Sequence, residues 1–444
     1  MSGLAPTQPE QASHRGWWMV FVLFLLYVFS WVDRLILSMM VDPIKASLSL
    51  NDYEIGLVMT TSFAVATSLF GIPTGWLVDR FPRRIILFVG VMMWSIATWL
   101  SGHAQSYAQL LAFRVLVGIG ETVIVPCAYS LIADAMPREQ LTRANASFQM
   151  GGKTGSAVSF ALGGPLIAFA ATAAAAGLPL MGGLEPWQRV MVMVGLPGLV
   201  LAFLAFSFPE PARRSFIAHD PADKKGELRR FLKANATLVI IMMISFSCLA
   251  SVGYTLTSWV PTFMSRHFGW QPAQYGPVVA ILNLISAASL VVNGAIVDKL
   301  FARGMKDAHM RFYSWLMLIV SPAAIGMFLI DSAWPFLAMY CVVQFVTVPF
   351  IVYVAGIVAL VAPNTIRATL IAMFQFVFTM VGLGVGPAVV GALSTFLYND
   401  PKRIGDAMFW VIVVSFILGF ITMRMGLAPL RRAMDGLTTP DENA

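Results

Sequence analysis

The sequence is poor in the residues that enzymes and metal sites use most. Its 444 residues include three cysteines and five histidines, and only 11% of the residues are charged. Cys127, Cys248 and Cys341 lie in apolar stretches without the paired spacing of a zinc or redox site. No set of nucleophile, base and orienting residue stands out. These scarcities argue against an enzyme, a metal centre and a resident cofactor.

What the sequence has instead is long apolar runs. It is 58% hydrophobic with a mean hydropathy of +0.77, whereas an average soluble chain is about 25% charged. Only helices and closed barrels satisfy their backbone polar groups in lipid, and the runs are about twice as long as the roughly ten-residue segments of a barrel. The sequence therefore predicts an all-α polytopic membrane protein.

Twelve candidate spans appear when a window of about 19 residues is moved along the chain. They are residues 17–41, 54–78, 85–103, 107–131, 143–169, 187–207, 236–264, 276–297, 312–330, 334–361, 367–396 and 407–424. The only long polar stretch separates the sixth span from the seventh. We therefore expect an N-terminal six-helix half (1–208), a cytoplasmic linker (209–234) and a C-terminal six-helix half (235–444).

Basic residues are unevenly distributed between the two sides of the predicted membrane. Of the 29 lysines and arginines, 21 lie on the side of both termini, 5 lie on the other side and 3 fall within spans. Because basic residues mark the cytoplasmic side, we expect a multi-pass protein of the cell membrane with both termini cytoplasmic. The net charge of +7 reflects topology and contact with anionic lipid heads, and gives no reason to propose nucleic acid.

Two short motifs recur in both halves. Residues 75–80 (GWLVDR) follow the second span and residues 294–299 (GAIVDK) follow the eighth, at an offset of 219 positions. The pair Arg-Ala follows the fourth span at 143–144 and the tenth at 367–368, at an offset of 224. Such repeats predict two related halves with a substrate site between them near the bilayer midplane.

The first repeat extends into the sharpest motif of the sequence. Residues 75–84 (GWLVDRFPRR) resemble the loop signature G-x-x-x-D-R-x-x-R-R of the major facilitator superfamily. The resemblance implies that superfamily's fold of twelve transmembrane helices in two six-helix pseudo-repeats, and a latch for the outward-facing state. Gly75 is expected to allow close helix packing, and Asp79 to pair with a basic residue or a helix N-terminus. The expected gating residues are Gly75, Asp79, Arg80, Arg83, Arg84, Asp134, Arg143 and Asp298.

Two groups within the superfamily share the next motifs. Residues 27–34 (YVFSWVDR) resemble a first-helix N-Y-x-D-R signature, although Ser30 and Trp31 stand where Asn and Tyr are usual. Residues 114–121 (RVLVGIGE) and 130–137 (SLIADAMP) are similar to segments of the spinster-like transporters. The anion:cation symporters, which carry sugar acids and other organic anions, share the acid–arginine pairs.

Both resemblances imply that Asp33 and Glu121 carry protons. Arg34 and Arg114 would then pair with these acids or with a substrate anion. Arg114 and Glu121 are seven residues apart, about two turns, so they share one face of a helix. An acid whose pair with an arginine forms and breaks can load a proton on one side and release it on the other. A static Arg114–Glu121 salt bridge is the alternative.

Further candidates for substrate binding lie in the fifth span and in the second half. Lys153 sits near the middle of its span, and such a cation needs a partner, either Glu121 or an anionic substrate. Away from the span ends, the second half has no charge within any predicted span. It offers polar or aromatic side chains, for which ordinary packing is the alternative: Tyr254, Trp259, Asn283, Asn293, Gln344, Tyr353 and Gln375. A charged wall facing an apolar, hydrogen-bonding wall favours an amphipathic anion.

The sequence thus predicts a secondary active transporter, proton-coupled and spinster-like, that moves a lysolipid-like organic anion by alternating access. A symporter for small organic or sugar acids is the first alternative. A passive facilitator or a sensor is the second, and it would not need both intramembrane acids. We expect the protein to act as a monomer in the bilayer.

Overall fold

The computed structural model describes residues 14–172, 182–213, 221–348 and 350–435, and within these ranges the chain is helical without any strand. The first half contains α1 (His14–Ile36), α2 (Val41–Leu48), α3 (Asp52–Gly56), α4 (Ser62–Arg80), α5 (Arg83–Ser101), α6 (Tyr107–Glu121), α7 (Ile124–Ala135), α8 (Leu141–Thr172) and α9 (Pro186–Ala202). Helix α10 (Pro221–Ala234) follows. The second half contains α11 (Ala236–Phe268), α12 (Pro272–Ala287), α13 (Ser289–Ala302), α14 (Ala308–Gly326), α15 (Ala333–Thr347), α16 (Phe350–Val361), α17 (Asn364–Phe378), α18 (Gly386–Ala392) and α19 (Ile404–Asp435).

Short 3-10 and π-helical segments prolong several of these helices into full spans. The main ones are η1 (Leu37–Met39), η2 (Leu57–Thr61), η4 (Phe203–Phe206), η5 (Thr379–Val385) and η6 (Leu393–Tyr398). Eleven helical stretches of the described chain are long and apolar enough to cross a membrane. The predicted span 312–330 is not among them. It corresponds to the 19-residue helix α14, which begins four residues earlier than expected and has His309 and Arg311 in its first turns. With α14, the described residues supply the twelve expected spans.

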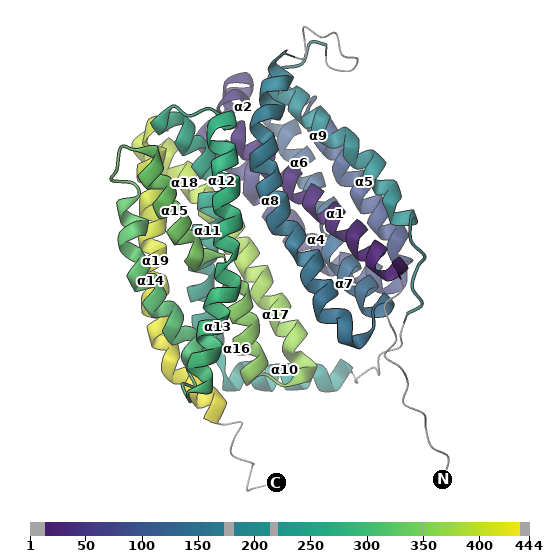
Figure 1. The fold of residues 1–444 in the computed structure, drawn as a ribbon, viewed down its shortest axis with the longest axis vertical. Coiled ribbons are helices and arrows are strands. Elements are labelled where there is room, and N and C mark those ends of the chain that lie inside the picture. Colours follow the sequence, from purple (N-terminus) through teal and green to yellow (C-terminus); the bar gives the residue numbers. More distant parts are fainter. Residues whose placement is uncertain (1–13, 173–181, 214–220, 349, 436–444) are drawn as a thin grey trace.

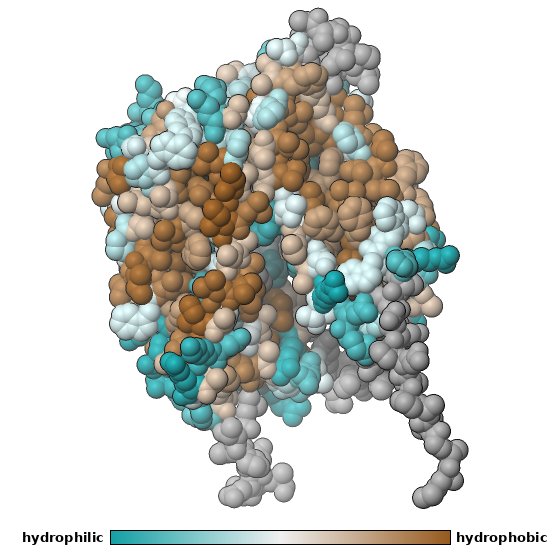
Figure 2. Space-filling view, in the orientation of Figure 1, coloured by the Kyte–Doolittle hydropathy of each residue, from teal (hydrophilic) through white to brown (hydrophobic). Residues whose placement is uncertain are grey.

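The two halves stand side by side as two bundles, and α10 crosses one end of the second bundle (Figure 1). We call the end at which α1 begins and α19 ends the proximal face, and the opposite end the distal face. Figure 2 shows apolar residues in a broad band around both bundles and hydrophilic residues gathered toward the two ends. This distribution is what a bilayer-spanning bundle requires, because lipid tails solvate only apolar side chains.

Glycines allow the closest helix contacts in the first half. A Cβ on Gly155 of α8 would lie 2.5 Å from the carbonyl oxygen of Val28 on α1, and one on Gly151 would lie 3.0 Å from that of Phe24. The two halves meet in the same way near the distal face, where a Cβ on Gly276 of α12 would lie 2.3 Å from the carbonyl oxygen of Phe160. Small residues thus let α8 contact both α1 and α12, as in other membrane bundles.

Two π-helical segments face each other across the halves. Thr61, at the end of η2, donates a hydrogen bond of 2.6 Å to the carbonyl oxygen of Gly384 in η5. A π-helical turn adds a residue and widens the helix, which changes where the following side chains point. Met59 and Thr60 of η2 and Leu383 of η5 line a cavity between the halves. The irregular turns therefore help to shape that cavity.

Candidate functional site

Two buried ion pairs join α1 to α6 inside the first half. Arg114 Nη1 lies 3.3 Å from Asp33 Oδ1, and Arg34 Nη2 lies 2.6 Å from Glu121 Oε2. The sequence-based alternative, an Arg114–Glu121 bridge along one face of α6, is not what the structure contains. Each residue of α6 instead reaches a partner on α1, so the four charges form two pairs between the helices.

Neutral hydroxyls also donate hydrogen bonds to both acids. Ser30 donates to Glu121 Oε2 at 2.6 Å, and Thr98 of α5 donates to Asp33. Some atoms remain without a hydrogen-bond partner among the described residues: Glu121 Oε1, Arg34 Nε, and Nε and Nη2 of Arg114. Buried polar atoms are nearly always paired in proteins, so such a group of exceptions is typical of a functional site.

The four charges differ in their access to solvent. Asp33, Arg114 and Glu121 are at most 3% exposed, whereas the side chain of Arg34 is 15% exposed. Of these four residues, only Arg34 lines the central cavity. Its guanidinium carbon lies 3.9 Å from the centre of the Phe63 ring and 4.8 Å from that of Trp31. Arg34 is therefore the one member of the two pairs that reaches the cavity, whereas Arg114 is buried and does not line it.

The central cavity has a volume of about 310 Å³ and is bounded by both halves. From the first half it is lined by Tyr27, Trp31, Arg34, Leu35, Ser38, Met59, Thr60, Gln149, Gly152, Lys153 and Ser156. From the second half it is lined by Ala250, Gly253, Tyr254, Thr257, Ser258, Asn283, Gln344, Thr347, Val348, Phe350, Gln375 and Leu383.

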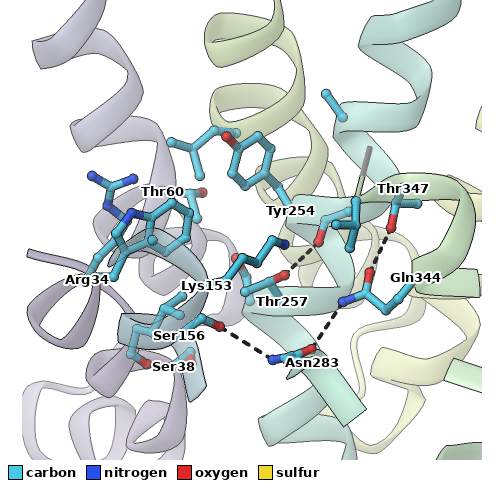
Figure 3. Close-up of a pocket in the computed structure, with 18 of the residues that line it drawn as sticks. Arg34, Ser38, Thr60, Lys153, Ser156, Tyr254, Thr257, Asn283, Gln344 and Thr347 are labelled. Carbon is cyan, nitrogen blue, oxygen red and sulfur yellow. Dashed lines mark hydrogen bonds between the residues drawn. The ribbon is translucent and has the colours of Figure 1, made fainter. Parts of the chain in front are cut away.

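Lys153 of α8 is the cation that the cavity leaves uncompensated. Figure 3 shows its side chain extending from α8 into the cavity toward Thr257 of α11. Among the described residues its amino group has neither an ion pair nor a hydrogen bond, and Glu121, one expected partner, binds Arg34 instead. Because a cation within a membrane protein is costly without a counter-charge, this position favours an anionic ligand.

The facing wall carries a chain of hydrogen-bonded side chains that sequence reasoning recognised only in part. Asn283 of α12 donates to Ser156 of α8 at 3.4 Å, and its Oδ1 accepts from Gln344 at 3.3 Å (Figure 3). Thr347 donates to Gln344 Oε1 at 2.7 Å. Asn283 and Gln344 were among the polar residues noted in the sequence. Ser156 and Thr347 were not, because serine and threonine occur throughout membrane helices and give no distinct signal.

The two substrate-binding candidates of the second half have different surroundings. Gln375 lines the cavity and donates to Thr379 at 3.2 Å. Tyr353 lies outside the cavity, 3% exposed, with its ring 4.3 Å from that of Tyr313 on α14. The sequence could not distinguish them, because both are polar residues in apolar helices.

The arginine-rich loop between α4 and α5 is anchored to α7 and to residues 208–211, where the first half passes into the linker. Arg83 is fully buried and binds Glu210 Oε1 at 2.8 Å, Asp134, and the carbonyl oxygen of Pro211 at 2.7 Å. Arg84 donates to the carbonyl oxygen of Phe208 at 2.6 Å. Partial burial tends to raise the pKa of the Glu210 carboxyl, but hydrogen bonds from Arg83 and from backbone N–H groups outweigh it and hold that pKa below its usual value.

The remaining gating candidates do not form the contacts expected of a latch in this conformation. A Cβ on Gly75 would meet no atom within 4 Å, so the close helix contact expected of it is not formed here. Asp79 and Asp298 are exposed, and neither forms an ion pair with a described residue. Arg80 stacks on Trp76, with 4.2 Å from its guanidinium carbon to the ring centre. Arg143 similarly lies over Trp17, at 5.1 Å.

The distal face, by contrast, is held closed by a network between the halves that sequence analysis did not predict. Arg266 of α11 binds Asp52 at 2.8 Å and Asp42 at 2.6 Å, both in the first half. Asp52 is 2% exposed, and it also binds Lys45 and accepts a hydrogen bond of 2.6 Å from Ser394. In the sequence Arg266 was only one of five basic residues on the outer side.

Comparison with known proteins assigns the class. Residues 23–387 match the family described as the Major Facilitator Superfamily, so the chain belongs to this superfamily of membrane transporters. Over 433 residues it is 27% identical to a protein named MFS-type efflux pump from Mycolicibacterium smegmatis, and the match covers 94% of each chain. Over 349 residues it is 26% identical to a probable galactarate/D-glucarate transporter of Bacillus subtilis, with 72% of each chain covered.

Among solved structures, the chain is similar to a bacterial homologue of the human lysosomal transporter Spinster, crystallised in an inward-facing and unoccupied conformation. The TM-score is 0.78 at 23% identity, and the match covers 97% of this chain and all of that one. The predicted fold and the resemblance to the superfamily are thereby confirmed. The protein is a transporter of this superfamily, similar to spinster proteins and to acid-sugar transporters, and not an enzyme.

Proposed function

We propose that this protein is a secondary active transporter that uses the proton gradient to move an organic anion by alternating access. The observation that carries the proposal is Lys153, which has no ion pair among the described residues and lies in a cavity between the halves. The same cavity is lined by Arg34, which belongs to one of the two buried acid–arginine pairs. A cation without a counter-charge favours an anion, and acids whose pairing can change supply sites for protons.

The orientation follows from charge. The proximal face carries the excess of basic residues, so we assign it to the cytoplasm, with both termini inside. The Arg266 network closes the distal side, and the exposed Asp79 and Asp298 leave the proximal side unlatched. The described conformation then corresponds to an inward-open state, and transport requires the distal network to break.

The proton sites would be Glu121 and Asp33. Glu121 binds Arg34, which lies at the wall of the cavity, so a substrate anion that attracts Arg34 would weaken its hold on Glu121. A carboxylate that loses its cation in a poorly solvated site gains a proton more easily. Substrate binding and proton binding would be coupled through this one arginine. Asp33 and Arg114, fully buried behind it, would form the second pair.

Within the class of organic anions, the geometry supports a compact hydroxylated anion better than the amphipathic one expected from the sequence. Both walls carry hydrogen-bonding groups, including Asn283, Gln344 and Thr347 opposite Lys153. An alkyl tail would strip water from these groups without replacing its hydrogen bonds, at a cost of about 1–3 kcal/mol for each group left unpaired. One relative is named as a sugar-acid transporter, which agrees with this preference.

An amphipathic anion is the second candidate. The observation that favours it is the group of aromatic rings in the lining, namely Tyr27, Trp31, Tyr254 and Phe350. Apolar burial contributes about 25 cal/mol per Å², so a tail resting on these rings could gain several kcal/mol.

The first prediction concerns Lys153. Lys153→Ala should weaken substrate binding roughly tenfold to a hundredfold, because a hydrogen bond to a charged group contributes about 1.5–3 kcal/mol. Lys153→Arg, which keeps the charge, should retain most of the affinity. Lys306→Gln, an exposed lysine that pairs with Asp435 far from the cavity, serves as the matched control. Binding is measured calorimetrically on purified protein. Equal affinity of Lys153→Ala and the control would contradict the anion site.

The same assay separates the two substrate classes. Sugar acids of increasing hydroxyl number are compared with single-chain carboxylates of increasing length. We expect affinity to depend on the hydroxyls and to change little with chain length. A steady gain with each added methylene, about 0.8 kcal/mol when it is buried, would instead support the amphipathic anion.

The second prediction concerns the proximal latch. Asp79→Asn should leave the described conformation unchanged, since Asp79 forms no ion pair with a described residue, and should destabilise the opposite state. The population should shift toward the inward-open state by about tenfold to a hundredfold, as expected for the loss of one hydrogen bond to a charged group. Distances between spin labels at the proximal ends of α4 and α17 report this equilibrium. An unchanged distance distribution in both the presence and the absence of substrate would leave Asp79 without a gating role.

A further inference from the structure

A second hollow lies on the outer side of the second half, between α14 and α19. Its volume is about 310 Å³, and its lining is apolar except for one hydroxyl. The lining residues are Met317, Leu318, Ser321, Ala324, Ile325, Val413, Phe416, Ile417, Phe420 and Ile421. The groove follows residues 413–421 of α19 for about 12 Å at 1.5 Å per residue. The two helices pack side by side at the edge of the second bundle (Figure 1).

An arginine stands at the proximal end of this groove. Arg424 follows Ile417 and Ile421 at helical spacing, so it lies on the same stripe of α19. Its guanidinium carbon is 5.5 Å from the centre of the Trp315 ring on α14, and both side chains are exposed. Among the described residues Arg424 has neither an ion pair nor a hydrogen bond. The groove therefore ends in a cation that the protein leaves uncompensated.

The surroundings decide which ligand fits. α14 and α19 are spans of a bilayer protein, and Leu318, Ile325 and Ile417 are exposed on them, so the groove opens toward lipid tails. Tryptophan is enriched where lipid tails meet head groups, which places Trp315 and Arg424 near the head groups of the proximal leaflet. Arginine pairs well with phosphate because its N–H groups match two oxygens at once.

We propose that this groove binds one anionic phospholipid of the proximal leaflet. The phosphate lies at Arg424 beside Trp315, and one acyl chain lies along the groove between α14 and α19. No residue lines both this groove and the central cavity. α11 lines the cavity and packs against α19, so it stands between the two sites. The bound lipid is therefore a resident of the protein surface and is not the transported substrate.

The test compares phosphatidylglycerol with phosphatidylcholine as probes. The full-length protein in detergent is titrated with each lipid, and bound lipid is counted by native mass spectrometry. Phosphatidylglycerol should bind more tightly than phosphatidylcholine, and Arg424→Gln should reduce this preference about fivefold, the effect of one basic residue near an anionic surface. Arg432→Gln, an exposed arginine two turns further along α19, is the charge control and should change nothing.

A second pair of variants tests the path of the acyl chain. Ser321→Phe places a ring in the groove, and Ile319→Phe places one on a lipid-facing position of α14 that does not line it. Phosphatidylglycerol with a photoreactive acyl chain should cross-link to peptides of α14 and α19 in the wild type and in Ile319→Phe, and less in Ser321→Phe. Equal binding of the two lipids, equal effects of Arg424→Gln and Arg432→Gln, or cross-links elsewhere would each overturn the proposal. Because Arg424 is exposed, its replacement does not endanger the fold.

Discussion

Glu121→Gln should abolish proton-driven accumulation of substrate while leaving exchange of substrate across the membrane largely intact. Gln keeps the shape and can still accept hydrogen bonds from Ser30 and Arg34, but it cannot carry a proton at this site. In proteoliposomes with an inward proton gradient, substrate should only equilibrate between the two sides. Exchange against internal substrate, which needs no net proton movement, is measured in the same vesicles.

Asp33 requires a different design, because its pair with Arg114 is fully buried. Asp33→Asn alone leaves an uncompensated arginine, which costs roughly 3–5 kcal/mol of stability. The double variant Asp33→Asn with Arg114→Gln removes both charges and should fold nearly as well as the wild type. It should also lose proton-driven accumulation if Asp33 carries a proton. Full accumulation by both Glu121→Gln and this double variant would refute the proton-coupling role of the two pairs.

Breaking the distal network should have the second large effect. Arg266→Gln leaves Asp52, which is 2% exposed, with Lys45 as its one remaining cation among the described residues, and it removes this ionic link between the halves. Because Asp52 keeps Lys45, the loss is that of hydrogen bonds from the charged Arg266, about 1.5–3 kcal/mol each, so the distal-closed state should lose roughly tenfold to a hundredfold in relative population. Spin labels at the distal ends of α2 and α18 should report the longer distance.

Arg403→Gln is the matched control for this experiment. Arg403 is also an arginine of the distal face, but it is 53% exposed and pairs with Asp406 only three residues away. Exposed pairs of this kind contribute little, so its replacement should leave the distance distribution unchanged. If Arg266→Gln behaves like this control, the halves are held together by packing such as that of Gly276 against Phe160, and the ion network is not the gate.

Much of the site could be anticipated because charge is so costly in a membrane. Arg34, Arg114 and Lys153 were evident as cations in apolar runs, and so were Asp33 and Glu121 as acids. Their pairing was not evident. Arg34 and Glu121 are 87 residues apart. The helical spacing within α6 pointed to an Arg114–Glu121 pair, whereas in the structure each of these two residues pairs with a side chain of α1.

The sequence by itself determined the class, the number of spans and the sidedness proposed here, because the bilayer imposes these through hydropathy and charge counts along the chain. The tertiary structure decided which helices meet. It brought Arg266 to Asp52 across 214 residues, joined Asn283 to Ser156 across the cavity, and separated Gln375, in the lining, from Tyr353, outside it. The physical reason is that burial in lipid acts on each segment alone, whereas a hydrogen bond or an ion pair requires two side chains whose distance depends on how the whole bundle packs.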